Sequence, residues 1–343
     1  TAPYMLPKTF RASCSKQCEA CPLAESQHEF IERDINPTDP DVLKMIDAPE
    51  ASVRKLMLNM AGMNPKPACR CHVDVVDTFN VEQILLIPTL DTATGQYVMR
   101  SSYFVGHGIQ SNRAYRFEGT TVPNPRDQHG THLFDVAKPV QDEIETFELT
   151  DDLKGKLKRF RPGKLNHMAF IMSIAEWQSR NVTKIHERPD LHVAIDLAFH
   201  STQSFIFNRE IVARGMLDIL ILGDTRCGKG YVTEGLSRYY GLGEIASGEN
   251  CTFAGLVGGL QQVGNRWLVT WGLIPLNHNR IVVIDEASSL SDVEIGRMSR
   301  VRSEGIAEIS KIVRESTRAN TRLIWLSDPR SGRPIMSYNS GIE

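Results

Sequence analysis

The stretch from Asp218 to Gly230, DILILGDTRCGKG, joins a short apolar run to a turn bounded by glycines and ending in a lysine. Its last eight residues follow the pattern GxxxxGK, in which backbone N–H groups converge on phosphate oxygens. We expect Lys229 to reach the terminal phosphates of a nucleotide, beside the positive end of a helix that begins near Gly230. The predicted nucleotide contacts are Gly223, Asp224, Thr225, Arg226, Cys227, Gly228, Lys229 and Gly230. Taken alone, the stretch is equally compatible with an ordinary strand, turn and helix with a surface lysine.

A second stretch, RIVVIDEAS from Arg280 to Ser288, ends an apolar run in two carboxylates. Adjacent carboxylates repel each other and need solvent or a cation, so packing does not explain the pair. We expect Asp285 to hold Mg²⁺ through its waters and Glu286 to polarise the attacking water. An acidic helix cap explains one carboxylate better than two. A third run, TRLIWLSDPR, ends in Ser327 and Asp328, and the three together favour ATP binding.

Residue 230 departs from the phosphate-loop pattern, because the usual Ser or Thr that binds Mg²⁺ is a glycine here. Mg²⁺ usually keeps several waters, so one more water can take the place of the hydroxyl. Losing such a group costs on the order of 1–3 kcal/mol, and a glycine in the first helical turn adds up to about 1 kcal/mol. We therefore expect nucleotide binding through Lys229 and the backbone, with weaker metal affinity and slower turnover.

Five of the seven cysteines fall in two tight clusters, CSKQCEAC and ACRCH. Closely spaced thiolates in two knuckles suit a tetrahedral Zn²⁺ ion, and the CxxxCxxC spacing also suits an iron–sulfur cluster. Small core cysteines are the simpler alternative, although clustering argues against them. Four of the following residues are predicted to bind the metal: Cys14, Cys18, Cys21, Cys69, Cys71 and His72.

The bulk composition of the 343 residues is that of an ordinary globular protein, with 41% hydrophobic and 23% charged residues. A formal net charge of −2 excludes a basic field over the whole molecule, so any nucleic-acid surface must be local. No apolar run approaches a membrane span, and no signal peptide opens the chain. We expect an intracellular protein without a membrane partner, trimmed at both ends from a longer chain.

The distribution of cysteines, strand patterns and helix patterns along the chain predicts a multidomain protein. Residues 1–72 carry the clustered cysteines as a metal module, and residues 73–145 are β-rich like an oligonucleotide-binding (OB) barrel that binds DNA. Residues 146–208 read as a helical linker or as the start of the module that follows. From residue 209 to residue 343, apolar strands alternate with helical stretches, as in a parallel sheet covered by helices. The predicted fold class is thus a metal-bearing, OB-like region followed by an α/β P-loop ATPase domain.

The stretch from about Gly215 to Arg333 resembles the minichromosome maintenance (MCM) helicases of the AAA+ ATPases. SGENCTFAGLVGGL is similar to their small-residue segment, and GNRWLVTWGLIPLNHNRIVVIDEAS to their insert hairpin and Walker B strand. EISKIVRESTRANTRLIWLSDPR is similar to their pre-sensor hairpin and sensor strand. The resemblance implies a ring, usually a hexamer, that binds ATP between subunits and grips DNA in its channel. It also implies a zinc module, and DNA contacts by Lys311, Arg314, Arg318 and Arg322. The alternative for each basic residue is a solvated face.

Two departures from the family put hydrolysis in doubt. Gly230 replaces the hydroxyl residue, and Asp328 stands where the sensor asparagine is expected, adding negative charge near the γ-phosphate. We also expect the C-terminal part of the domain to be truncated, because no arginine finger can be placed before Glu343. The main hypothesis is an ATP-dependent DNA helicase or translocase, located in the cytoplasm with the nucleoid or in a nucleus. One rival is a DNA-binding AAA+ scaffold of genome defence or a mobile element, in which ATP drives assembly. A weaker rival is a remodeller of protein substrates.

Overall fold

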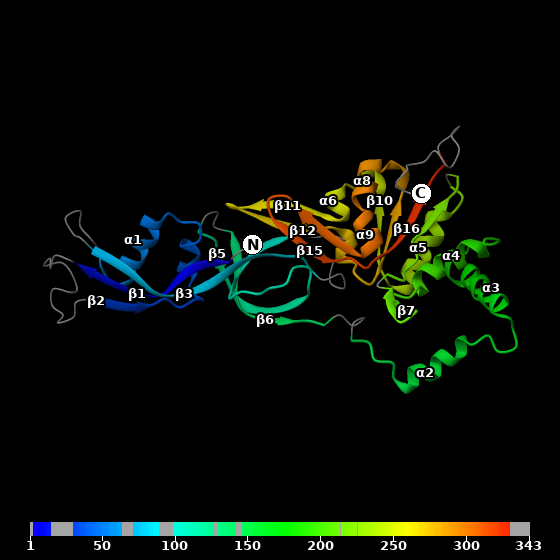
Figure 1. The fold of residues 1–343 in the computed structure, drawn as a ribbon, viewed down its shortest axis with the longest axis horizontal. Helices are drawn as coiled ribbons and strands as arrows, with labels where there is room; N and C mark the ends of the chain where they lie inside the picture. Colours follow the sequence, from blue (N-terminus) through cyan, green and yellow to red (C-terminus); the bar gives the residue numbers. More distant parts are fainter. Residues whose placement is uncertain are drawn as a thin grey trace. The chain divides into compact units, whose positions relative to one another are not determined.

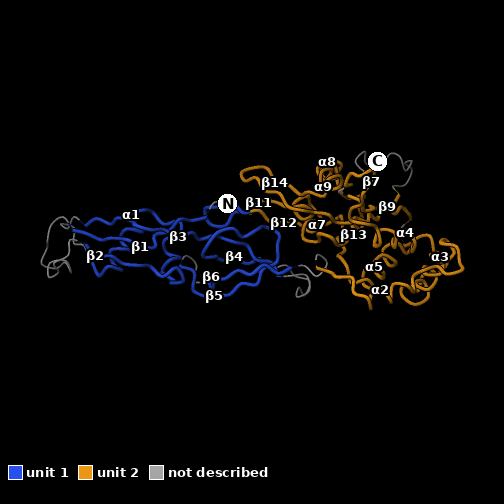
Figure 2. Tube along the Cα trace, turned by 60° about the horizontal axis from the view of Figure 1, so that its bottom comes forward, with its two compact units in different colours: residues 1–141, 262–268 blue, residues 142–261, 269–343 orange. Residues whose placement is uncertain are grey.

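The computed structural model describes residues 3–14, 30–63, 71–88, 99–125, 129–141, 146–212, 214–224 and 226–329 (Figure 1). The chain divides into two compact units (Figure 2). The first unit comprises residues 1–141 and 262–268, and the second comprises residues 142–261 and 269–343. Among the described residues, no helix is both long and apolar enough to cross a membrane.

The first unit is built on a sheet of six strands in the order β2-β1-β3-β4-β6-β5. Neighbouring strands are antiparallel except for the parallel pair β4 and β6. The strands are β1 (Tyr4–Cys14), β2 (Phe30–Asp34), β3 (Cys71–Leu86), β4 (Arg100–Val105), β5 (Tyr115–Pro123) and β6 (Gly130–Pro139). Helix α1 (Glu50–Met60) packs against β1 and β3, and a 3₁₀ turn spans Pro40–Lys44.

The boundary predicted at residue 72 is wrong, because it falls inside β3. Strand β1 pairs with β3 along nearly its whole length, and both contribute to one hydrophobic core that contains Phe10 and Val81, each fully buried. The segments 1–72 and 73–145 therefore form one unit. A local sequence pattern does not show pairing between residues that lie far apart in the chain, as between Tyr4 and Val81. The OB barrel stays a prediction.

The expected helices of residues 146–208 are present. They are α2 (Asp151–Leu157), α3 (His167–Gln178) and α4 (Pro189–His200), with a π-helical turn at Ser179–Thr183 between α3 and α4. The side chains of Thr150 and Asn166 cap α2 and α3 by accepting backbone N–H groups, as such residues do at helix starts. Helix α4 packs with the sheet that follows it in the chain, since Leu191 and Ile195 lie in the same core cluster as Val283.

That sheet contains four parallel strands in the order β10-β13-β16-β9. They are β9 (Ile219–Leu222), β10 (Glu244–Ser247), β13 (Ile281–Asp285) and β16 (Arg322–Ser327). The alternating strands and helices expected from the sequence are therefore found in this unit. The intervening helices are α5 (Lys229–Tyr240), α6 (Phe253–Leu256), α7 (Leu273–Leu276), α8 (Asp292–Arg297) and α9 (Ser299–Glu304).

Helices cover both faces of this sheet (Figure 1). Val283 packs with α4 and α5, whereas its neighbours Val282 and Ile284 pack with α6, α7, α8 and α9. Successive side chains of a strand point to opposite faces, so a continuous apolar run is what a strand buried on both sides requires.

Three hairpins accompany the sheet. They are β7 (Phe205–Phe207) with β8 (Glu210–Val212), β11 (Gly258–Val263) with β12 (Arg266–Trp271), and β14 (Ile306–Ser310) with β15 (Arg314–Arg318). The last two lie in the segments that the resemblance assigns to the insert and pre-sensor hairpins.

Candidate nucleotide-binding site

The carboxyl ends of the parallel strands bring the predicted nucleotide residues together. Ser247 lies opposite Asp285 in the register of β10 and β13, and Ser327 lies opposite Leu222 in that of β16 and β9. The phosphate-loop stretch follows β9, and Asp328 follows β16. Ligands of open α/β sheets bind beyond this edge.

Lys229 is the first residue of α5, and Gly228 precedes it in the left-handed conformation with φ 87°. The lysine is only 8% exposed. Its Nζ donates to the Gly223 carbonyl at 2.5 Å, to the Asp224 carbonyl at 2.9 Å and to Asp328 Oδ1 at 2.5 Å. Two loop carbonyls and one carboxylate thus surround the ammonium group. Of the eight predicted contacts, Thr225 lies outside the described residues.

The two carboxylates of the acidic strand lie where β13 ends. Asp285 Oδ1 accepts the Glu286 N–H at 3.0 Å. Glu286 has a positive φ of 54°, a conformation that is uncommon for residues with a side chain and that occurs often at functional sites. Partial burial raises the pKa of Glu286, and the nearby charges of Asp328, Asp285 and Glu249 raise it further. A raised pKa of this kind is typical of a group that moves protons.

Gly230 lies beside the acidic strand. A Cβ atom built at this glycine would be 3.4 Å from Asp285 Oδ2, an ordinary contact distance. A hydroxyl side chain at position 230 therefore fits next to Asp285, the residue predicted to hold Mg²⁺ through its waters. Because residue 230 is a glycine, the hydroxyl that the phosphate-loop pattern has at this position is missing.

Three of the four predicted DNA-contacting residues lie on the β14–β15 hairpin. Lys311 follows β14 in the turn and is exposed, and Arg314 and Arg318 are exposed at the two ends of β15. Arg314 Nε donates to Glu308 Oε1 at 2.9 Å, and Glu308 also accepts from Arg300. This acidic residue offsets part of the positive charge of the hairpin.

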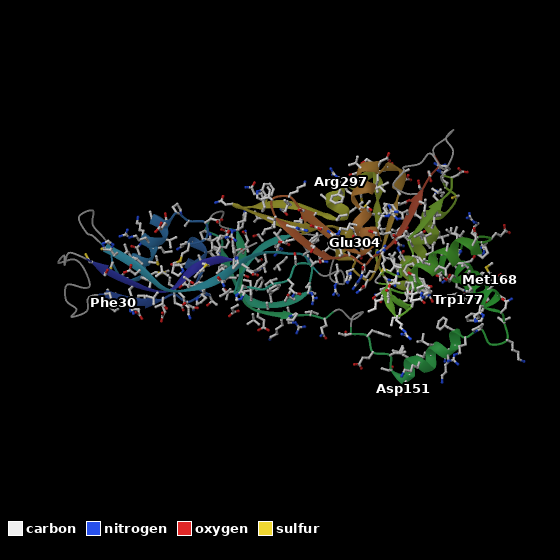
Figure 3. All side chains as sticks on the ribbon, in the orientation of Figure 1. Phe30, Asp151, Met168, Trp177, Arg297 and Glu304 are labelled. Carbon is white, nitrogen blue, oxygen red and sulfur yellow. The ribbon has the colours of Figure 1, made fainter. Side chains whose placement is uncertain are left out.

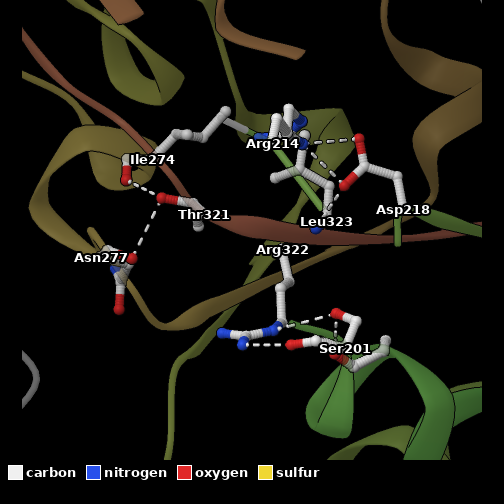
Figure 4. A network of polar contacts seen from close by, with 9 residues as sticks. Ser201, Arg214, Asp218, Ile274, Asn277, Thr321, Arg322 and Leu323 are labelled. Carbon is white, nitrogen blue, oxygen red and sulfur yellow. Dashed lines mark hydrogen bonds and ion pairs between the residues drawn. The ribbon is translucent and has the colours of Figure 1, made fainter. Parts of the chain in front are cut away.

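The DNA contact predicted for Arg322 is wrong, because this residue is the buried start of β16. It is 9% exposed, and its guanidinium donates to the Ser201 hydroxyl at 3.2 Å and to the Ser201 carbonyl at 2.7 Å (Figure 4). It also donates to the Asn279 carbonyl at 3.1 Å. Burial lowers the pKa of the guanidinium. Arg322 instead ties the end of α4 to the sheet.

Three of the six predicted metal ligands lie where the end of β1 pairs with the start of β3. Cys14 is opposite Cys71, and His72 is opposite Ser13. This register places one cysteine of each cluster opposite the other. Cys18, Cys21 and Cys69 lie outside the described residues, and among those described no three potential ligands form a group that could hold a metal. Metal binding stays a prediction.

Five rings that the sequence reasoning missed form a row on one face of β4, β5 and β6. The Phe117 ring centroid lies 6.3 Å from Phe104, 5.6 Å from Tyr115 and 4.9 Å from Phe134. His132 stacks on Phe134 at 5.6 Å. All five are half-buried, whereas Tyr103 and Leu133 on the same strands enter the core. In the sequence, the alternating patterns YRF at 115–117 and HLF at 132–134 are the features from which this row could be predicted.

No protein-family model matches the chain, and no curated protein matches it either.

Proposed function

We propose that the protein is an ATP-dependent DNA helicase or translocase of the MCM-like AAA+ type. The observation that carries this proposal is the meeting of Lys229, Asp285, Glu286 and Asp328 beyond one edge of a parallel sheet. A cation from a phosphate-loop stretch and carboxylates from two further strands are the groups that nucleotide hydrolysis needs.

Each residue then has a role in hydrolysis. Lys229 leaves its present acceptors and binds the terminal phosphates, together with the N–H groups of the loop and of the first turn of α5. Asp285 holds Mg²⁺ through its waters, and bound Mg²⁺ offsets the charge of the phosphates. Glu286 orients the attacking water, and its raised pKa keeps it a stronger base than an ordinary carboxylate.

DNA binding is supported by two surfaces, one in each unit. The β14–β15 hairpin presents Lys311, Arg314 and Arg318 to solvent, where they can bind phosphates. In the first unit, the five-ring row offers half-buried aromatic faces on which unpaired bases can stack. Phe117→Ala should weaken binding of single-stranded DNA more than that of duplex DNA. Equal losses for both would remove the row from this proposal.

Self-association into a ring, most simply a hexamer, is supported by apolar side chains exposed on the second unit. Met168 and Trp177 of α3 are 65% and 50% exposed (Figure 3). Four residues of the β7–β8 hairpin are 45–75% exposed: Phe205, Ile206, Phe207 and Ile211. Apolar patches of this kind often mark protein interfaces.

A second candidate function is a DNA-binding AAA+ scaffold in genome defence or a mobile element, in which ATP drives assembly rather than unwinding. Gly230 and the ion pair between Lys229 and Asp328 favour it, because both oppose an efficient hydrolytic centre. Under either function, we propose that the protein is intracellular and binds DNA. Zinc remains the proposed metal of the cysteine clusters, with an iron–sulfur cluster as the alternative.

Strand displacement on forked DNA, measured beside ATPase activity and DNA binding, separates the two functions. A motor displaces the strand only with ATP, whereas a scaffold binds DNA and nucleotide without displacement. Imaging of particles with and without ATP tests for the ring. Lys229→Ala should lose nucleotide binding, and retention of nucleotide by this variant would contradict both functions.

A further inference from the structure

The cation of Lys229 is held by a carboxylate. Its Nζ lies 2.5 Å from Asp328 Oδ1, and the two side chains are only 9% and 28% exposed. Hydrogen bonds between charged partners of this kind are short and about twice as strong as neutral ones. A ligand that needs Lys229 must therefore break this ion pair.

The surroundings of the pair are strongly acidic. Asp285, Asp328 and Glu249 each act on Glu286 and raise its pKa, and Lys229 acts on it in the opposite direction. A third phosphate brings further negative charge to the place where these carboxylates meet. A diphosphate brings less charge and keeps its contacts with the loop N–H groups and the start of α5.

We propose that Asp328 is a specificity-determining residue that competes with the terminal phosphate for Lys229, so that the site favours nucleoside diphosphates over triphosphates. The proposal rests on the nucleotide-binding function proposed above and adds a preference that the phosphate loop alone does not give. Gly230 strengthens this preference, because it supplies no hydroxyl to help Mg²⁺ offset the third phosphate.

Asp328→Asn is the direct test, because it keeps the size of the side chain and removes its charge. Calorimetric titration with ADP and with a non-hydrolysable ATP analogue, each with Mg²⁺, gives the two dissociation constants. Removing a competing charged hydrogen bond should tighten binding of the triphosphate roughly ten- to hundredfold. Binding of ADP should tighten much less. Asp328→Ser removes the same charge with a smaller side chain and should shift the ratio in the same direction, should the asparagine variant fold poorly.

Glu249→Gln is the matched control. It removes one negative charge from the same group of carboxylates, and Glu249 is exposed. This variant should change the affinities of both nucleotides by the same small factor. An unchanged ratio of triphosphate to diphosphate affinity in both Asp328 variants, or an equal shift in Glu249→Gln, would overturn the proposal.

The outcome also separates this inference from the proposed function. If the parent binds the triphosphate, Lys229→Ala does not, and the ratio of the two affinities is the same with Asp, Asn or Ser at position 328, the specificity role fails and the nucleotide site stands. If neither the parent nor the Asp328 variants bind any nucleotide, both proposals fail together.

Discussion

Restoring a hydroxyl at position 230 should strengthen the metal site. In Gly230→Ser the new Cβ lies 3.4 Å from Asp285 Oδ2, so the side chain enters without displacing its neighbour. The serine hydroxyl extends about 1.4 Å beyond Cβ, which lets one rotamer bring it within hydrogen-bonding distance of Asp285. A bound Mg²⁺ then gains a protein ligand in place of a water.

The expected magnitude follows from two contributions. A hydroxyl that donates to a carboxylate or binds a metal adds roughly 1–3 kcal/mol, which is about five- to 150-fold in the affinity for the Mg²⁺–nucleotide complex. Replacing a helical glycine by serine adds up to about 0.5 kcal/mol to stability, because serine has the better helix propensity. The first contribution requires nucleotide and metal, whereas the second is present without them.

Gly230→Ala is the control, since it supplies Cβ and helix propensity without the hydroxyl. ATPase activity and nucleotide affinity measured over a range of Mg²⁺ concentrations should show half-saturation at lower Mg²⁺ for the serine variant only. Thermal unfolding without nucleotide should show a gain for both variants. Identical Mg²⁺ dependence in the serine, alanine and parent proteins would refute the placement of residue 230 beside the metal.

Arg322→Met should lower the free energy of unfolding in urea by about 2–4 kcal/mol, because buried carbonyls lose their donor. Lys311→Ala should change stability by less than about 0.5 kcal/mol and should reduce the salt dependence of DNA binding by about one phosphate contact. A small loss of stability in Arg322→Met together with a large loss in Lys311→Ala would contradict the burial of Arg322. Glu286→Gln should raise the melting temperature of the protein measured without nucleotide at neutral pH. It should leave the melting temperature unchanged at a pH well below the ordinary glutamate pKa of about 4.3. The reason is that the pKa of Glu286 is raised in the native state, so its ionised form destabilises the fold above that pKa. Below the pKa of the unfolded chain the group is protonated in both states and does not change the stability. Solvent screening keeps this gain under about 1 kcal/mol, and an equal gain at both pH values would argue against charge repulsion. Gly119→Ala should destabilise the first unit by about 1–3 kcal/mol, since a Cβ there would lie 2.2 Å from the Leu133 carbonyl; an unchanged urea midpoint would contradict the close strand approach.

The strands and the loop of the nucleotide site could be predicted from the sequence because their signals are local. Residues 219–222 and 281–284 are uninterrupted apolar runs, which indicate strands of a parallel sheet. The second run is buried throughout, whereas Leu220 in the first is 39% exposed. The pair formed by Lys229 and Asp328 joins residues 99 positions apart, and only the strand order brings them together. The burial of Arg322 was missed for a related reason. Its charge suggested a surface, whereas its position at the start of β16 places it beside the end of α4.

The first unit was harder to predict for the same physical reason. Turn residues and alternation identify individual strands, but they do not specify which strands pair. Strand β1 lies in the segment that the cysteines dominate, and its partner β3 begins after a separation of more than 50 residues. The aromatic row likewise depends on β4 lying beside β6 and on β5 lying beyond it.

Strand β16 is an anchored element, since all six of its residues are buried and it pairs with a strand on each side. Asp328 follows directly after this strand and forms an ion pair with Lys229, the first residue of α5. At the other end of α5, the Tyr240 hydroxyl donates to Asp196 of α4 at 2.8 Å. Helix α5 thus connects the ion pair of Lys229 and Asp328 at its first residue to α4 at its last.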